Sequence, residues 1–316
     1  MTKLKLKIAD IIIGIESSFA QKRIAKREER LEHNERFNNF FYQGKAKPNI
    51  RIKVEIVNKL PKIRKAELLF ITNHFQDGSE NWRWLKKGNS YIYKSPLEAK
   101  EQLMLVNKTF DRVTAYLLHK KDDAWVWSIT DIIYDFLQVL LINYFAHKKE
   151  GIFTHAVGIK DSGDKGFIFI GKSGAGKSTT ARLWHKNSKA MVLNDDRIIV
   201  RRDSNRFFIH GSPWHGEFSD YLKSRIESAP LERLFFIHHS FKNKAKQISE
   251  KDAFNLLYPA LFPAFWDKDS LKNIISFAGD LIKAVPSYRL GFVNNKRVIE
   301  FVRKNQKIKD AVPNSL

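Results

Sequence analysis

The chain has 316 residues, 43% of them hydrophobic and 13% aromatic, which excludes a disordered protein and suffices for two domains with buried cores. It contains no cysteine, which excludes disulfides, thiolate zinc sites and cysteine nucleophiles, and which fits a reducing compartment. Lysine and arginine outnumber aspartate and glutamate by 56 to 34, and the net charge of +22 is that of proteins with acidic partners.

The opening residues 1–14 alternate between polar and apolar in the manner of a strand, and they lack the small-residue cleavage site of a signal peptide. No apolar run reaches the roughly 18 residues of a membrane span. We therefore expect a cytoplasmic protein with no membrane span. The densest basic cluster, residues 22–30, includes two glutamates and is typical of a solvated helix face. Without a zinc finger, an RRM signature or basic heptads, nucleic-acid binding is disfavoured as the main role, although the net charge does not exclude it.

Residues 1–147 are predicted to form a smaller, mostly β N-terminal domain of unknown role. Its strands are expected in a meander with turns at Asp77-Gly78 and Lys87-Gly88-Asn89. The strand candidates are 49–57, 67–71, 90–93, 102–106 and 112–118. Residues 132–145 then predict a helix that is apolar nearly all round and therefore buried.

Residues 148–316 are predicted to form a second domain of α/β (mixed α+β) type. Two strand patterns, 152–159 and 166–170, flank the turn Asp161-Ser162-Gly163-Asp164 and predict a β-hairpin. Further strands are expected at 190–193, 198–202, 207–210, 234–238 and 288–292, and helices around 252–261 and 272–284.

The most informative segment follows the second arm of that hairpin. Residues 171–178 read GKSGAGKS and match the phosphate-binding pattern G-x-x-x-x-G-K-[ST] in full, with a strand before them and a helix pattern after them. Such a loop turns its backbone N–H groups inward and places an anion at a helix N-terminus. The residues predicted to bind the nucleotide are Gly171, Lys172, Ser173, Gly174, Ala175, Gly176, Lys177, Ser178 and Thr179. Lys177 is expected to reach the β- and γ-phosphates, and the Ser178 hydroxyl to ligate Mg²⁺.

Asp195 and Asp196 end the apolar strand that follows the helix of this loop. One carboxylate could hold Mg²⁺ and the other could take a proton from an acceptor hydroxyl. Successive strand residues point to opposite faces, so the two need not share one role. The alternative is a polar turn, because Asn-Asp-Asp favours turns.

Two further candidates are less specific. His155 lies on the first arm of the hairpin, where it could face a reacting hydroxyl or be a structural histidine. The segment Gly211-Ser212-Pro213-Trp214-His215-Gly216-Glu217 predicts a loop in which Trp214, His215 and Glu217 shape a substrate pocket. The alternative is a structural turn with a packed tryptophan.

Taken in order, His155, the loop at 171–179, Leu-Asn-Asp-Asp at 193–196 and the Gly-Ser-Pro-Trp loop resemble the catalytic domain of the HPr kinase/phosphorylase family. The resemblance covers about residues 148–293 and implies a P-loop fold shared with ATP-type phosphoenolpyruvate carboxykinases. It implies binding of ATP and Mg²⁺, with Asp195 as the base assisted by His155, and with Ser178 and Asp196 at the metal. Relatives of this group are often oligomeric, which makes a homo-oligomer an expectation.

The sequence therefore predicts an ATP- and Mg²⁺-dependent kinase that transfers the γ-phosphate to a serine or similar hydroxyl of a protein or peptide. Two alternatives stay open. One is a nucleotide-binding sensor or scaffold that docks an acidic partner, and the other is a small-molecule kinase.

Overall fold

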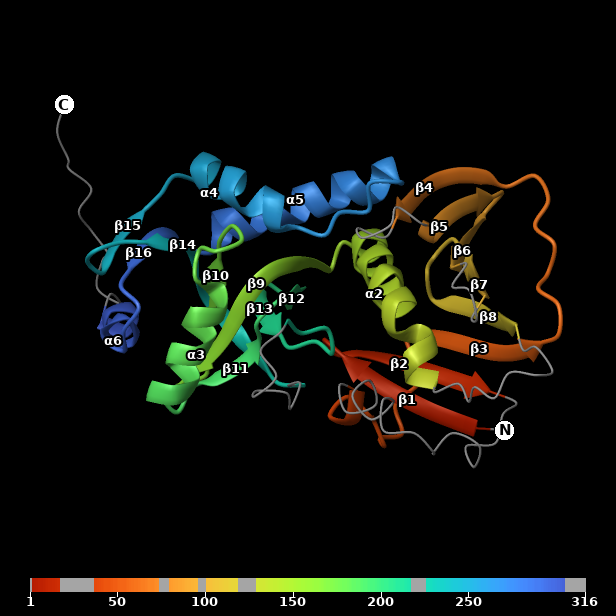
Figure 1. Cartoon of the computed structure of the whole chain (residues 1–316), viewed down its shortest axis with the longest axis horizontal. Helices are drawn as coiled ribbons and strands as arrows, with labels where there is room; N and C mark the ends of the chain where they lie inside the picture. The colour runs from red at the N-terminus through yellow and green to blue at the C-terminus, as the bar shows by residue number, and fades with distance from the viewer. Residues whose placement is uncertain are drawn as a thin grey trace. The chain divides into compact units, whose positions relative to one another are not determined.

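The computed structural model describes residues 2–17, 37–73, 80–95, 101–118, 129–216 and 226–304 (Figure 1). The basic segment 22–30 and Glu217 lie outside these ranges. Within the described residues the chain is of mixed α/β type and forms two eight-stranded sheets, and it divides into two compact units. Of the described residues, the first unit holds those of Met1–Phe153 and Phe262–Phe277 with Ile226, and the second those of Thr154–Tyr221, Glu227–Leu261 and Ala278–Leu316.

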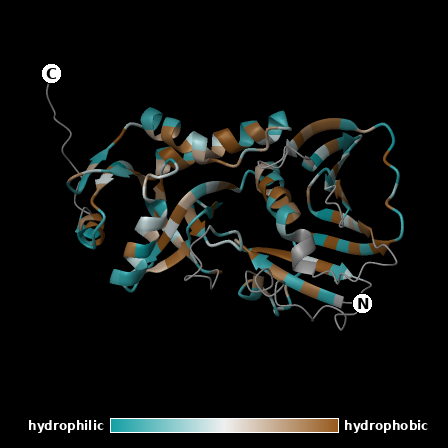
Figure 2. Cartoon of the chain, in the orientation of Figure 1, coloured by the Kyte–Doolittle hydropathy of each residue, from teal (hydrophilic) through white to brown (hydrophobic). Residues whose placement is uncertain are grey.

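The first unit contains one sheet, with strand order β1-β2-β3-β8-β7-β6-β5-β4, and one long helix. Figure 2 shows hydrophilic and hydrophobic residues alternating along several of its strands, which is the pattern of strands that bury one face. Its elements are β1 (Thr2–Ile8), β2 (Ile11–Ser17), β3 (Ile50–Val57), β4 (Glu67–Asn73), β5 (Glu80–Lys87), β6 (Ser90–Ser95), β7 (Gln102–Asn107), β8 (Arg112–Leu118) and α2 (Ile129–Lys148).

The predicted meander is confirmed only in part. Strands β4 to β8 pair antiparallel with their chain neighbours, as expected of a meander. Strand β3, however, pairs in parallel with both β2 and β8. A parallel pair needs a long crossover between its strands, and here the connection from β3 to β8 is made of β4 to β7 themselves. Alternation identified β3 as a strand, but it carries no information about the partners of that strand.

The opening strand pattern is two strands rather than one. Ile8 pairs with Ile11, and Ala9 and Asp10 between them have positive φ angles of 46° and 61°. Two such residues form the tight type I′ hairpin turn, which usually requires glycine or asparagine. Because Ala-Asp lacks that signature, the sequence gives no sign of the break.

Helix α2 is buried, as its sequence predicts. Phe136, Leu137, Leu140, Leu141 and Phe145 are all fully inaccessible to solvent. In the part of the chain that the structure describes, no helix has both the length and the apolar character needed to cross a bilayer.

The second unit is built on a sheet whose pairings run β10-β9-β12-β13-β14-β16-β15, with β11 added to β9. Strand β10 also pairs with β14, so the path from β10 through β9, β12 and β13 returns to β10 as a closed ring. Helix α5 contributes residues to both units. The elements are β9 (Gly151–Asp161), β10 (Lys165–Ile170), α3 (Lys177–Asn187), β11 (Met191–Asn194), β12 (Arg197–Asp203), β13 (Arg206–His210), β14 (Ser228–His239), β15 (Lys244–Gln247), α4 (Glu250–Leu257), η4 (Tyr258–Ala260), α5 (Lys268–Ala284), β16 (Ser287–Phe292) and α6 (Arg297–Lys304).

The predicted hairpin at the start of this unit is confirmed. Strands β9 and β10 pair antiparallel, and Asp161 lies opposite Lys165 across the turn. Gly163 and Asp164 take the positive φ angles of 69° and 59° that the turn requires. On its other side β10 runs parallel to β14, so the loops that follow β10 and β14 emerge at the same edge of the sheet.

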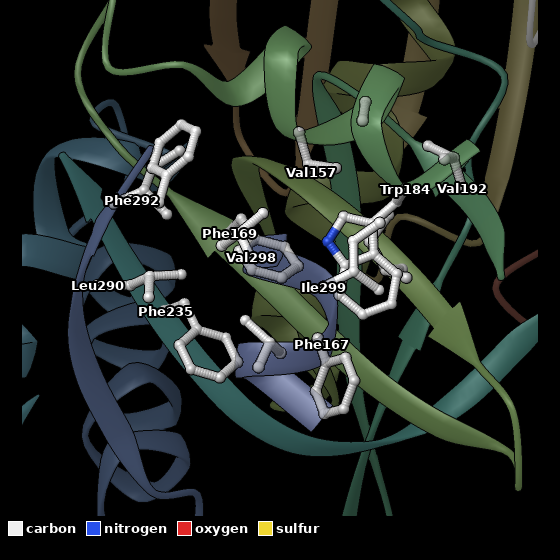
Figure 3. Packing of buried hydrophobic residues seen from close by; sticks show 14 of the residues in the cluster. Val157, Phe167, Phe169, Trp184, Val192, Phe235, Leu290, Phe292, Val298 and Ile299 are labelled. Atoms are coloured by element: carbon white, nitrogen blue, oxygen red, sulfur yellow. The ribbon is translucent and has the colours of Figure 1, made fainter. Parts of the chain in front are cut away.

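Helix α3 is held against this sheet by a buried aromatic cluster (Figure 3). The Trp184 ring lies 6.0 Å from both Phe167 and Phe169 of β10, measured between ring centroids. Burying an aromatic side chain of this size contributes roughly 1.5–3 kcal/mol, so the helix has one favoured position on the sheet. Its first turn is thereby fixed at the end of β10.

Candidate functional site

The loop between β10 and α3 has the placement that its sequence predicts. β10 ends at Ile170 and α3 begins at Lys177, so residues 171–176 connect strand and helix directly. At two of the glycines, neighbouring atoms leave no room for a side chain. A Cβ on Gly171 would lie 2.8 Å from Ala175 Cβ, and one on Gly176 would lie 2.6 Å from Phe292 Cζ. Gly176 also has a φ of 98°, which side chains rarely tolerate.

We expect the substitution Gly176→Ala to lower the free energy of unfolding by about 2–5 kcal/mol, because backbone strain and the clash with buried Phe292 add. Urea denaturation measures the change. Gly279→Ala is the matched control, since Gly279 lies in α5 with no atom within 4 Å of its would-be Cβ. That variant should gain about 0.5–1 kcal/mol. Equal stabilities of Gly176→Ala and wild type would contradict the strain argument.

The start of α3 is suited to an anion. Its N-cap, Gly176, offers no side-chain hydrogen bond, and the first turn contains no acidic residue. The first N–H groups of a helix lack partners within it, and the positive end of the helix dipole lies there. A phosphate group would therefore meet donors and a favourable field at this end of α3.

Of the two lysines in the segment 171–178, Lys177 is buried and Lys172 is exposed. Lys177 Nζ donates to Gly171 O at 2.9 Å and to Lys172 O at 3.3 Å, and the residue is 9% exposed. An ammonium group has three hydrogens, so one stays available for a phosphate oxygen. Burial lowers the pKa of Lys177, and the charge of Asp196 acts in the opposite direction.

Asp196 is held between the side chains of His155 and Arg197. His155 Nε2 lies 2.9 Å from Oδ1, and an Arg197 guanidinium nitrogen lies 2.5 Å from Oδ2. The backbone fixes this geometry, because Ala156 N donates to Asp196 O at 3.1 Å. Burial alone would raise the pKa of Asp196, but the hydrogen bond from His155 and the charge of Arg197 outweigh it and lower the pKa. Asp196 is therefore ionised at neutral pH.

Asp195 has the opposite environment. Its Oδ1 accepts a hydrogen bond of 2.9 Å from Gly216 N, and the residue is 8% exposed. Burial raises the pKa of Asp195; the Gly216 bond opposes this, and the charge of Asp196 adds to it. Two adjacent carboxyl groups whose pKa values move apart are typical of sites that need one fixed charge and one proton carrier.

Asn194 positions both aspartates, and the sequence analysis did not assign it this role. Its Nδ2 donates to Ser212 O and to Trp214 O, each at 2.9 Å. Its Oδ1 accepts from the backbone N–H groups of Asp196 and Arg197, each at 2.8 Å. One buried amide thus joins the end of β11 to the loop that contacts Asp195.

Asn194→Ala leaves several buried polar groups without this partner, so we expect a loss of roughly 2–4 kcal/mol in the free energy of unfolding. Asn187→Ala is the control, because Asn187 is exposed and makes one hydrogen bond, to Leu183 O. Its effect should stay within about 0.5 kcal/mol. Urea titration of the two variants measures both changes. A similarly small loss of unfolding free energy in both would show that Asn194 does not stabilise the link between β11 and the loop 211–216.

The loop predicted at 211–217 is described as far as Gly216. Trp214 is only 3% exposed, which favours the packed tryptophan over one that lines a pocket. His215 is half-buried, and its Nδ1 donates to Gly216 O at 2.8 Å. The contact of this loop with the site runs instead through its backbone, at Gly216 N. Glu217, the third predicted pocket residue, lies outside the described residues.

Several predicted nucleotide residues lie at the surface of the loop. Lys172, Ser173, Gly174 and Ser178 are exposed, as an incoming phosphate would require. Among the described residues no three histidine, aspartate or glutamate side chains group closely enough to bind a metal by themselves. Ser178 and Asp196 carry oxygen donors of the kind that Mg²⁺ prefers, and two such donors would leave its other positions to phosphate oxygens and water.

The sequence matches no protein-family model and no curated protein. Among solved structures, the chain is similar to one described as the Hpr(Ser) kinase/phosphatase from Coxiella burnetii. That match has 11% sequence identity and a TM-score of 0.30, and it covers 50% of this chain and 97% of the other. The likeness is weak by both measures, and the candidate site depends on its own geometry.

Proposed function

We propose that the second unit is an ATP- and Mg²⁺-dependent kinase that phosphorylates a serine or similar hydroxyl of a protein or peptide. The observation that carries the proposal is the pair Asp195 and Asp196, held in different environments by Gly216 N and by His155, in the sheet from which the 171–178 loop emerges. A binding site for phosphate alone would need the loop but not this pair.

Different residues would perform different parts of phosphoryl transfer. The backbone of residues 171–176, the N-terminus of α3 and Lys177 bind the phosphates and offset their charge. Asp195, whose raised pKa favours proton uptake, accepts the proton of the acceptor hydroxyl. The acceptor oxygen bonds to the γ-phosphorus, the bond from that phosphorus to the bridging oxygen breaks, and ADP leaves with the electron pair. Mg²⁺, when held by Ser178 and Asp196, would neutralise charge on the phosphate oxygens.

His155 and Arg197 act through Asp196 in this scheme. By holding both carboxylate oxygens they keep Asp196 ionised and fix its orientation. Each carboxylate oxygen has a second lone pair, so these contacts leave acceptor capacity for a metal ion. We therefore assign His155 to positioning Asp196, in place of the assistance to Asp195 that the family resemblance implies.

The test uses the full chain, ATP labelled in the γ-phosphate, Mg²⁺ and a heat-treated extract of the source cells, with a chelator control. Label on a protein, lost with the chelator, would support the proposal. Label found only on small molecules would show that the acceptor is a metabolite and not a protein. ATP binding without transfer would leave a nucleotide sensor, and a chain that binds no ATP would overturn the proposal altogether.

A further inference from the structure

A second loop lies beside the phosphate loop in space although it is distant in sequence. β14 runs parallel to β10, with Phe236 opposite Ile170, so the loop 240–243 after β14 emerges next to the loop 171–176. His239, the last residue of β14, joins the two directly. Its Nε2 donates to Gly174 O at 2.8 Å.

The two ends of the 240–243 loop are held by hydrogen bonds to the end of β16. Ser240 N donates to Phe292 O at 3.1 Å, and Val293 N donates to Asn243 Oδ1 at 2.9 Å. The His239 ring lies 5.8 Å from the ring of Phe292, the same side chain that limits space at Gly176. The loop is thus anchored at both ends, in contact with the element that shapes the phosphate loop.

The tip of this anchored loop carries Phe241, whose side chain is fully exposed at 107%. The other exposed large hydrophobic residues that the structure describes range from 37% to 61%. A phenylalanine gains about 1.5–3 kcal/mol when it leaves water, so full exposure on a fixed loop favours a partner that covers the ring.

We propose that Phe241 binds the base of the nucleotide by stacking. The inference rests on the proposed function, because the phosphates of that nucleotide would occupy the adjoining loop 171–178. Two residues of chain span at most about 7 Å, so Phe241 stays close to His239 and hence to Gly174. The ligand is a nucleoside triphosphate, and because every base has a π-face, stacking alone distinguishes adenine poorly from guanine.

The test distinguishes binding of the nucleotide base from binding of the phosphates. Mg·ATP and Mg·tripolyphosphate, which lacks the base and the sugar, are titrated against the full chain by calorimetry. We expect Phe241→Ala to raise the Kd for ATP about 5- to 150-fold, as for the loss of one base–aromatic stack, and to leave the Kd for tripolyphosphate within twofold. Phe241→Trp should retain the affinity for ATP. Phe265→Ala, which removes another exposed phenylalanine, is the control and should change neither Kd.

Equal weakening of both ligands by Phe241→Ala would mean that the substitution disturbs the phosphate loop, and it would overturn the stacking assignment. An unchanged Kd for ATP would overturn it as well. In both cases the wild type still binds ATP, and the proposed function stands. A wild-type chain that binds neither ligand would overturn the proposed function and the inference together.

Discussion

Asp195→Asn is expected to leave the binding of Mg·ATP unchanged and to lower phosphoryl transfer by about 10²- to 10⁴-fold. Asparagine keeps the side-chain oxygen that accepts the hydrogen bond from Gly216 N, so the loop 211–216 should hold its place. The amide cannot take a proton from an acceptor hydroxyl, so the chemical step alone is affected. Steady-state transfer and ATP titration on the same preparation measure the two effects.

The control for the charge change is Asp203→Asn, since Asp203 is an exposed residue at the end of β12. It should transfer phosphate at the wild-type rate. Transfer that survives in Asp195→Asn would remove Asp195 from the role of base and point to another proton acceptor.

The pH dependence of stability shows whether the loss of transfer reflects chemistry or unfolding. Burial raises the pKa of Asp195 above its ordinary value of 3.8, so the folded state binds this proton more tightly than the unfolded state. The resulting stabilisation is complete below pH 3.8 and is lost as the pH rises through the folded pKa. Asparagine does not titrate, so the variant does not lose this stabilisation as the pH rises. The Tm of the variant minus that of wild type should therefore rise between pH 3.8 and the folded pKa of Asp195, and then level off. A Tm difference between variant and wild type that does not rise with pH over that window would contradict this expectation.

The features that the sequence predicts correctly are those encoded by neighbouring residues. The glycine spacing of 171–178, the apolar run before it and the helix pattern after it are local, and the strand, loop and helix form where expected. The turn Asp161–Asp164 likewise predicts the β9–β10 hairpin, because glycine and aspartate tolerate the positive φ angles that the turn needs.

The features that it misses depend on residues far apart in the chain. His155 could not be assigned to Asp196 from the sequence, because the contact is set by how β9 aligns with residues 195–197. The role of Asn194 arises from a loop 18 residues further on that folds back over β11. A polar residue before an aspartate pair is typical of a turn. Only the hydrogen bonds from Asn194 to the buried carbonyls of Ser212 and Trp214 show that it also links β11 to a distant loop. The position of Phe241 near the loop 171–176 likewise depends on the parallel pairing of β10 with β14.

The other large effect is expected at Lys177, where replacement by methionine should weaken both binding and transfer. Methionine keeps most of the buried aliphatic volume but removes the ammonium group that bonds to Gly171 O and Lys172 O. A hydrogen bond to a charged group contributes about 1.5–3 kcal/mol, which corresponds to a rise of about 10- to 150-fold in the Kd for ATP. Transfer should fall by a further 10²- to 10³-fold, because the proposed site loses one positive charge that would stabilise the transition state.

Lys186→Met makes the same change in charge at an exposed position of α3 and separates a local effect from a general one. A net charge of +22 attracts ATP electrostatically, and any non-specific part of the affinity would disappear with added salt. If Lys177 contacts the phosphates, the difference between the two variants should persist at 0.3 M salt, where surface attraction is largely screened. Equal affinities of Lys177→Met and Lys186→Met for ATP would show that the loop 171–178 does not bind the nucleotide.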